Sequence, residues 1–100
     1  MSAGVEIGDR ATRVARIRAA LEAALAPVAL EVVDDSARHA GHEGARDGRG
    51  HFNVDVVSTA FEGMRSLARH RAVYAALDTM MTTDIHALSI RALTPDEAAR

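Results

Sequence analysis

The strongest constraint on the fold of this chain is the stretch from position 51 to position 58, in which apolar and polar residues alternate through position 56. Successive side chains of a β-strand point to opposite faces of its sheet. Phe52, Val54 and Val56 therefore share one face, and the polar residues between them share the other. The pattern predicts a half-buried strand, in a sheet that has one face covered by other elements and one face open to water.

Helical periodicity precedes and follows this strand. From Asp9 onwards apolar residues recur at spacings of three and four, which predicts an amphipathic helix that ends at or just before Pro27. The residues of its apolar stripe are Val14, Ile17, Leu21, Leu25 and Val28. A second helix is predicted over residues 66–81, after a break at Gly63. Its apolar stripe comprises Leu67, His70, Tyr74, Leu77 and Met81, with Val73 and Met80 beside it.

Two further strands are predicted at residues 30–34 and 85–93. In the second of them His86, Leu88 and Ile90 are predicted to share one face, because they alternate with the other residues. A short final helix is predicted from Thr94-Pro95-x-Glu97, which combines an N-cap, a proline in the first turn and a capping-box glutamate. Residues 36–50 are rich in glycine, histidine and charge without periodicity, which predicts a long loop.

The predicted order of elements is helix, strand, strand, helix, strand. Two strands joined by a loop favour antiparallel pairing, whereas a strand–helix–strand connection favours a right-handed parallel crossover. The sequence therefore predicts a two-layer α+β domain, in which helices cover one face of a three-stranded mixed sheet. We expect residues 1–8 to be a disordered N-terminus and residues 9–100 to form a single domain.

The composition excludes several classes of protein. The chain has 100 residues, a formal net charge of −2, no cysteine and no lysine. Disulfides and a self-sufficient thiolate metal site are excluded, and the net charge provides no general attraction to phosphate. No apolar run is long enough for a transmembrane helix, and the first residues lack the apolar region of a secretory signal, so we expect a cytoplasmic protein without a membrane partner.

Catalytic motifs are lacking. No serine stands in a Gly-x-Ser-x-Gly elbow, and the glycines fit neither a Walker loop nor a dinucleotide fingerprint. The carboxylates of Asp34 and Asp35 are neighbours on a predicted strand, where successive side chains point to opposite faces. They are therefore not positioned to act together on one substrate. We therefore expect a protein that is not an enzyme.

Histidines are the candidate metal ligands of this chain. They are His39 and His42 in the predicted loop, His51 at the start of a strand, His70 in a helical stripe and His86 in the last strand. Neutral imidazole is a good ligand for zinc, iron and copper. A zinc site from the loop and strand histidines is one possibility, but each histidine also has an ordinary structural interpretation. His70 in particular is predicted to be a buried core residue, and His86 either lies in the core or emerges at the rim of the sheet.

Arginines make one local basic patch. Arg65, Arg69 and Arg71 flank His70 on the second predicted helix. They form either a solvated helix face or a phosphate contact by a helix that follows the turn at Gly63. With few aromatic residues nearby, base stacking is not supported.

Taken together, the motifs resemble those of the BolA family. The similarity covers roughly residues 14–97. Its downstream motifs are Phe61-x-Gly63, Arg69-His70-Arg71-x-Val73-Tyr74, Ile85-His86-Ala87-Leu88-Ser89-Ile90 and Thr94-Pro95-x-Glu97. Its upstream motifs are Leu30-Glu31-Val32, Asp35-Ser36, His39-Ala40-Gly41-His42 and His51-Phe52-x-Val54.

The resemblance implies a fold and a role. The fold would be α-β-β-α-α-β of the type II KH kind, with an extra short helix near residues 63–67. The role would be to pair with a monothiol glutaredoxin around a shared [2Fe–2S] cluster, with glutathione supplying a further thiolate. His86 would be one ligand and a histidine of the loop the other, either His39 or His42, with His39 slightly favoured by its place after Ser36. On its own the chain is expected to be a monomer or a weak homodimer.

The resemblance also implies an alternative function, because some members of the family are described as DNA-binding transcriptional regulators. Arg65, Arg69 and Arg71 would then contact the nucleic acid. The negative net charge and the missing Gly-x-x-Gly phosphate clamp of KH domains argue against it. The sequence departs from the family in one place, where Ala98 and Ala99 replace an aromatic residue that often follows the Thr-Pro-x-Glu segment.

Overall fold

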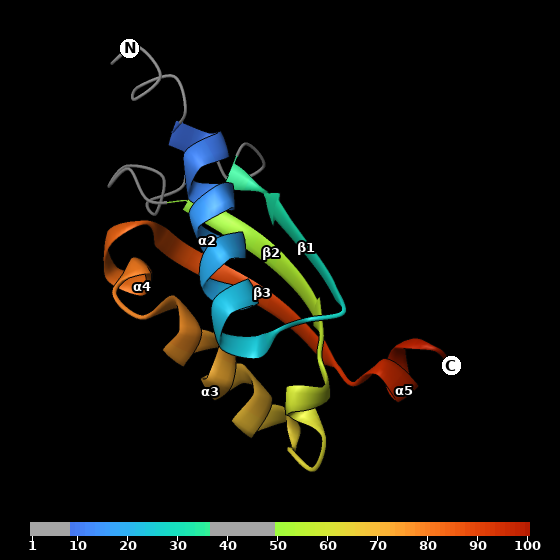
Figure 1. Cartoon of the computed structure of the whole chain (residues 1–100). Helices are drawn as coiled ribbons and strands as arrows, with labels where there is room; N and C mark the ends of the chain where they lie inside the picture. Colours follow the sequence, from blue (N-terminus) through green and yellow to red (C-terminus); the bar gives the residue numbers. More distant parts are fainter. Residues whose placement is uncertain (1–8, 37–49) are drawn as a thin grey trace.

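The computed structural model describes residues 9–36 and 50–100, and their elements follow the predicted order (Figure 1). The predictions for residues 1–8 and for the loop, with His39 and His42, lie outside the described residues. The elements are α2 (Asp9–Leu25), β1 (Ala29–Asp34), β2 (Gly50–Val57), the 3-10 turn η3 (Thr59–Phe61), α3 (Ser66–Leu77), α4 (Met80–Thr83), β3 (Ile85–Leu93) and α5 (Pro95–Ala98).

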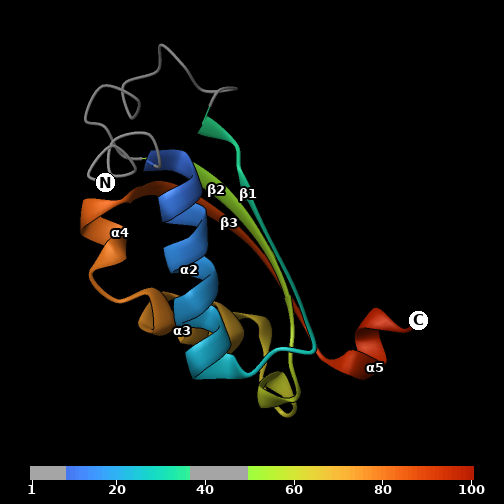
Figure 2. The ribbon, with the colours of Figure 1, turned by 45° about the horizontal axis from the view of Figure 1, so that its top comes forward.

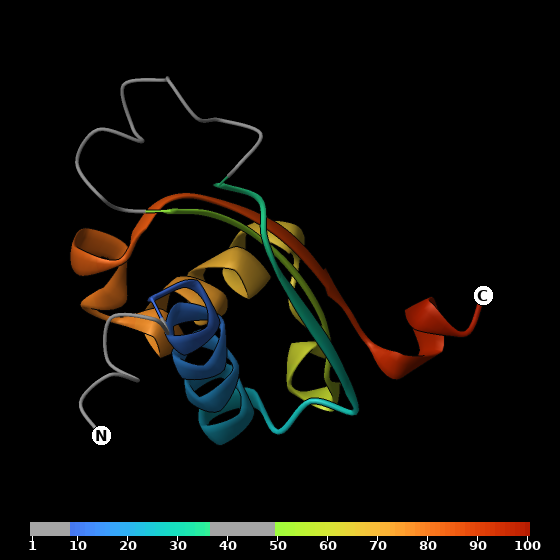
Figure 3. The ribbon, with the colours of Figure 1, turned by 90° about the horizontal axis from the view of Figure 1, so that it is seen from above.

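The three strands form one mixed sheet in the order β1-β2-β3. β1 pairs with β2 antiparallel, and β2 pairs with β3 parallel. Both pairings confirm the prediction from the connections. Figures 2 and 3 show that α2, α3 and α4 lie against the same face of this sheet. In the part of the chain that the structure describes, no helix packs across the other face, which we call the open face. The fold is therefore a two-layer α+β domain.

The core lies between the helices and the covered face of the sheet. Phe52, Val54 and Val56 of β2 are buried, whereas Asp55 is exposed, which confirms the alternation predicted for this strand. The helices and the turn contribute the remaining buried residues. These are Ile17, Leu21 and Leu25 from α2, Phe61 from η3, Val73 and Leu77 from α3, and Met80 from α4, with Val32 from β1 and Ile85 from β3.

The second predicted helix does not continue to Met81. It ends at Leu77, because Asp78 takes a positive φ of 52° with ψ of −127°, which is not helical, and a separate turn of helix, α4, follows. The backbone N–H of Asp78 still donates to the carbonyl of Tyr74 and closes the last turn of α3. The predicted extra helix near residues 63–67 is also wrong, since the short turn lies earlier, at Thr59–Phe61.

The buried face of α3 agrees only in part with the predicted stripe. Leu77 is buried as predicted, and so is Val73, which was predicted beside the stripe. Leu67 and Tyr74 are exposed, and two partly buried alanines, Ala72 and Ala76, complete the packed face. Because alanine side chains are small, α3 packs closely against its neighbours. Leu67 and Tyr74, on the adjacent part of the helix surface, remain exposed to solvent. Val28 of the first predicted stripe is exposed as well, because α2 ends at Leu25.

The C-terminal helix confirms its predicted capping box. The Thr94 hydroxyl accepts a hydrogen bond from the backbone N–H of Glu97, and the Glu97 carboxylate accepts one from the backbone N–H of Thr94. Among the described residues, no helix is long and apolar enough to cross a membrane.

Candidate functional site: paired histidines on the open face of the sheet

His86 lies on the open face of the sheet, exposed to solvent. The prediction that it shares a face with Leu88 and Ile90 is wrong, and a β-bulge is the reason. Gly50 of β2 pairs with Ile85, but the next residue, His51, pairs with Ala87. His86 is therefore an extra residue in β3. Such a bulge changes the direction of a side chain, and bulges are frequent beside functional sites.

His51 is the neighbour of His86 across the bulge. The centroids of the two imidazole rings are 5.2 Å apart, and their planes are inclined by 51°. His51 is half-buried, and its Nε2 atom is shielded from solvent. The sequence places His51 on the polar side of its strand, but the contact with His86 depends on the bulge and is not visible in the sequence.

The two ends of the loop between β1 and β2 are fixed next to His51. The backbone N–H of His51 donates to the Ser36 hydroxyl over 3.0 Å, and the His51 carbonyl accepts from the backbone N–H of Asp35 over 2.7 Å. The Asp34 carboxylate accepts from the backbone N–H of Ser36 over 2.8 Å. The described chain thus enters the loop beside the histidine pair.

Gly50 marks the other end of the loop, and it is tightly packed. Its backbone N–H donates to the carbonyl of Asp84 over 2.9 Å. A methyl group at Gly50 would lie only 2.8 Å from both the ring of Phe52 and the Ser36 hydroxyl. The backbone can reach this position only because the residue has no side chain.

An ion-pair cluster missed by the sequence analysis holds this end of the sheet to the helices. The buried carboxylate of Asp84 lies 2.8 Å from the guanidinium of Arg16 and 3.5 Å from that of Arg13. The two arginines belong to α2, and Asp84 directly precedes β3. Their spacing of three on one helix was the available signal, but nothing in the sequence indicates which carboxylate they meet.

No metal centre can be assigned from the described histidines alone. Within residues 9–36 and 50–100, no three histidine, cysteine or carboxylate side chains gather closely enough to hold a metal ion. His70 is half-buried in α3 rather than fully buried, which corrects its predicted place in the core. His39 and His42, the predicted loop ligands, lie outside the described residues.

The predicted arginine patch is divided. Arg65 and Arg71 are exposed, but Arg69 is mostly covered, with 13% of its side chain accessible. Its guanidinium donates to both carboxylate oxygens of Glu97, at 2.6 and 3.1 Å, and to the carbonyls of Met64 and Ala92. The hydrogen bonds from Arg69 and from the backbone of Thr94 lower the pKa of Glu97 to about 2. Arg69 is therefore occupied in joining α3, β3 and α5.

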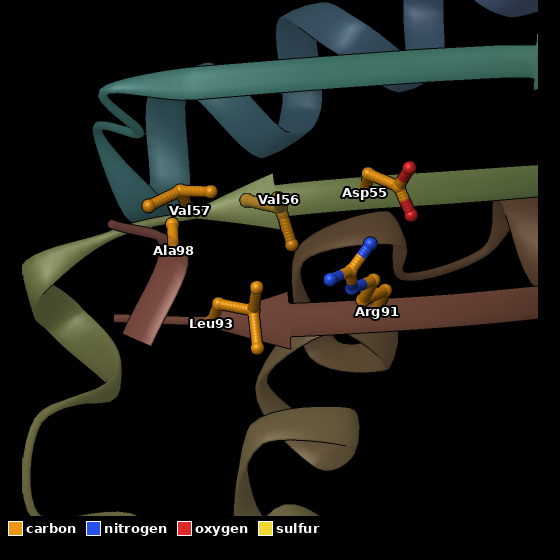
Figure 4. Close-up of a pocket in the computed structure, with 6 residues that line it drawn as sticks. All are labelled: Asp55, Val56, Val57, Arg91, Leu93 and Ala98. Carbon is orange, nitrogen blue, oxygen red and sulfur yellow. The ribbon is translucent and has the colours of Figure 1, made fainter. Parts of the chain in front are cut away.

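A shallow hollow lies at the other end of the open face. Figure 4 shows Asp55 and Arg91 at its rim, with Leu93 and Ala98 of the β3–α5 corner nearby. Its volume is about 190 Å³, which is small for a ligand pocket. None of the described histidines lines it, so this hollow is separate from the pair of His51 and His86.

Comparisons with known proteins agree with this fold. The model of the family described as BolA-like protein matches residues 21–97. The chain is 44% identical over 98 residues to protein BOLA1, chloroplastic, of Arabidopsis thaliana, a match that covers 95% of this chain and 61% of that protein. It is also 44% identical over 82 residues to the DNA-binding transcriptional regulator BolA of Escherichia coli, covering 82% of this chain and 75% of that protein.

Solved structures give the same result. The BolA domain of SufE1 from Arabidopsis thaliana superposes with a TM-score of 0.75 at 47% identity, covering 85% of this chain and 94% of that one. BolA1 from Arabidopsis thaliana superposes with a TM-score of 0.73 at 45% identity, with the same coverage of both chains. The chain belongs to the BolA-like protein family. It spans only 61% of the length of the chloroplastic BOLA1 protein. Family membership therefore does not assign an activity or partners to this chain.

Proposed function

We propose that this protein is a partner of a monothiol glutaredoxin, with which it co-ligates a [2Fe–2S] cluster for cluster trafficking or iron regulation. The observation that carries the proposal is the solvent-exposed imidazole of His86, which the β3 bulge presents on the uncovered face of the sheet. A ligand that is to meet a metal held partly by another protein has to be accessible in this way. The residues on either side of it, Ile85 and Ala87, are paired with β2, which holds this part of β3 in place before the partner binds.

The second ligand of the proposed site comes from the loop. His39 follows Ser36 by three residues, and three residues of extended chain span at most about 11 Å. Ser36 is itself hydrogen-bonded to His51, the ring neighbour of His86. The corresponding reach from Ser36 to His42 is about 22 Å, so His39 is the more closely tethered candidate.

The donor chemistry suits a shared cluster. Imidazole is a competent ligand for iron, and a [2Fe–2S] cluster has four protein-side ligand positions. Because the chain has no cysteine, thiolates have to come from a partner, and a glutaredoxin with glutathione supplies two. Replacing thiolates by neutral imidazoles reduces the negative charge at the cluster, which raises its reduction potential.

Anaerobic reconstitution tests this proposal. The protein is mixed with a monothiol glutaredoxin, glutathione, iron and sulfide, and the product is followed by visible circular dichroism and native mass spectrometry. We expect a heterodimer that contains one [2Fe–2S] cluster, with a spectrum distinct from that of the glutaredoxin homodimer. A spectrum and mass identical to those of glutaredoxin alone would overturn the proposal.

DNA binding is the second candidate function, favoured by the similarity to the Escherichia coli regulator. Of the three arginines predicted to contact DNA, Arg69 forms an ion pair with Glu97. Only Arg65 and Arg71 remain exposed for phosphate contacts, which weakens this candidate. Binding to duplex DNA measured against salt concentration tests it, because each neutralised phosphate contributes about 0.9 to the slope of log affinity against log salt. A specific complex with a steep slope would favour DNA.

A further inference from the structure

The outward face of α3 carries large apolar side chains that the fold does not cover. Leu67 is 62% exposed, Tyr74 is 41% exposed, and Met64, in the turn before the helix, is 36% exposed. Leu67 and Tyr74 are two turns apart on one side of the helix, and Arg71 stands between them. Single exposed apolar residues are common, but a contiguous group of them marks an interaction site.

This face is hollowed at its N-terminal end. A shallow, wide-open groove of about 620 Å³ lies along the turn and the first turns of α3, lined by Gly63, Met64, Arg65, Leu67, Ala68 and Arg71. The floor is apolar, and the two arginines are its charged members. We call Met64, Arg65, Leu67, Ala68, Arg71 and Tyr74 the α3 face.

The charge of the α3 face is uniform. Residues 63–77 contain three arginines and one histidine but no acidic residue, although the whole chain has a net charge of −2. Arg69 is neutralised by Glu97, so Arg65 and Arg71 are the exposed cations of the face. The nearest acidic residues in the sequence, Glu62 and Asp78, stand just outside the two ends of this segment.

The α3 face is remote from the paired histidines. Arg69 of α3 donates to the carbonyl of Ala92, near the end of β3, whereas His86 lies at the start of that strand. Six residues of strand separate the two positions, which corresponds to about 20 Å. Figure 2 shows α3 on the helical side of the sheet, opposite the open face that carries His86. The α3 face and the histidine pair therefore lie on opposite sides of the sheet and are distinct surfaces.

We propose that the α3 face binds an acidic amphipathic helix of a partner protein. Apolar side chains of that helix fill the groove beside Leu67, and its carboxylates meet Arg65 and Arg71. A second copy of this chain does not fit, because two such faces would place arginines against arginines. Duplex DNA fits less well, since two exposed arginines make few phosphate contacts and the apolar side chains gain nothing from the backbone of a nucleic acid. The proposal is independent of the cluster role and holds whether or not that role is correct.

A synthetic peptide tests the α3 face. The probe is about 20 residues long, enough to form an isolated helix, with leucines at helical spacing and glutamate and alanine elsewhere. Its binding to the ¹⁵N-labelled full chain is measured by chemical-shift changes and by fluorescence anisotropy. We expect shifts confined to residues 63–75. A peptide of the same composition with its leucines shuffled off one face, and a peptide with lysine in place of glutamate, should bind at least about ten-fold more weakly.

Matched variants of the protein separate this surface from general effects. Leu67→Glu and Arg71→Glu should each weaken binding about ten-fold or more. Val28→Glu and Arg91→Glu are the controls, because Val28 is 67% exposed and Arg91 is exposed on the open face of the sheet. They should leave the affinity within about two-fold, and all four variants should keep the wild-type melting temperature within a few degrees, as expected for surface positions.

Three outcomes would overturn the proposal. The first is peptide binding that is absent, or that the control variants weaken as much as Leu67→Glu does. The second is self-association in sedimentation velocity that Leu67→Glu abolishes, which would make a second copy the occupant. The third is tighter binding of a DNA duplex that depends on Arg65 and Arg71 but not on Leu67, which would make the face a nucleic-acid surface.

Discussion

The imidazole rings of His51 and His86 lie side by side on the uncovered face of the sheet, with centroids 5.2 Å apart and planes inclined by 51°. The two residues belong to adjacent strands, and the bulge in β3 brings them together. One half of the proposed cluster site is therefore built on a bulge flanked by paired strand residues, while the other half comes from a loop. A ligand on a strand is positioned more accurately than one on a loop.

The first prediction concerns this ring contact. His51→Ala should change the chemical shifts of the imidazole protons of His86, because the neighbouring ring current is removed. His51→Phe should retain most of the effect, since an aromatic ring remains in place. Both are measured by two-dimensional NMR of the free protein. Identical His86 signals in wild type and His51→Ala would show that the two rings do not touch in solution.

The second prediction concerns the tight packing at Gly50. Gly50→Ala should destabilise the fold by about 1–3 kcal/mol, the usual cost of forcing an extra carbon into a packed site. The added methyl group has to displace the ring of Phe52 or the Ser36 hydroxyl. Chemical denaturation provides the free energy of unfolding.

Gly63→Ala is the control for Gly50→Ala. Nothing lies within 4 Å of a methyl group at Gly63, but its φ of 81° is unfavourable for alanine. This variant should cost about 1–2 kcal/mol through the backbone alone. It should leave the NMR signals of Phe52 in place, whereas Gly50→Ala should move them. An unchanged stability of Gly50→Ala would contradict the packing described.

The third prediction concerns the ion pair between Arg69 and Glu97. Hydrogen bonds from Arg69 and from Thr94 lower the pKa of Glu97 to about 2, from an ordinary value of 4.5. A carboxyl whose pKa is lowered by folding stabilises the folded state when the pH is above its pKa in the unfolded chain. This contribution is lost as the pH falls from about 4.5 to about 2. Arg69→Met should raise the pKa of Glu97 in an NMR titration and reduce the acid-dependent part of the stability.

The pair of Arg100 and Asp96 is the control for Arg69→Met. Its two side chains are 73% and 78% exposed, and they lie one turn apart on the C-terminal segment. Exposed pairs of this kind contribute little. Arg100→Met should therefore leave the acid transition unchanged. A normal titration of Glu97 in the wild-type protein would contradict the structure at this point.

The fourth prediction separates the two loop histidines. His39→Ala should remove most of the visible signal of the reconstituted glutaredoxin complex, and His42→Ala should have a small effect, because His39 is tethered more closely to Ser36. Absorption and circular dichroism measure both. Equal and small effects of the two substitutions would place the second ligand elsewhere.

The sequence predicts the layers of this fold better than it predicts the site. The alternation at positions 51–58 and the helical spacing before Pro27 depend on burial, which is read directly from residue type, and the structure confirms both. The positive φ of Asp78, which ends α3, was not predicted, because an aspartate in a helical pattern gives no signal for this backbone conformation. The buried side of α3 was predicted only in part: Val73 and Leu77 are buried, but Ala72 and Ala76 pack against the core, and Leu67 and Tyr74 are exposed.

The geometry of the candidate site depends on contacts between secondary-structure elements, which the sequence does not show. The exposure of His86 follows from one extra residue in β3, and a bulge has no signature in the strand itself. The occupation of Arg69 by Glu97 joins residues 28 positions apart. The resemblance to the BolA family singled out His86, but the contact with His51 and the division of the arginine patch required the structure.

His86→Ala, reconstituted with a monothiol glutaredoxin, glutathione, iron and sulfide, tests the cluster role most directly. The side chain is exposed, so the variant should fold with nearly wild-type stability, and His70→Ala is a control of the same chemistry on a helix remote from the site. We predict that His86→Ala abolishes the circular dichroism signal of the shared cluster and leaves only that of the glutaredoxin homodimer, while His70→Ala retains the shared signal. A folded His86→Ala protein that gives the wild-type spectrum would contradict the account.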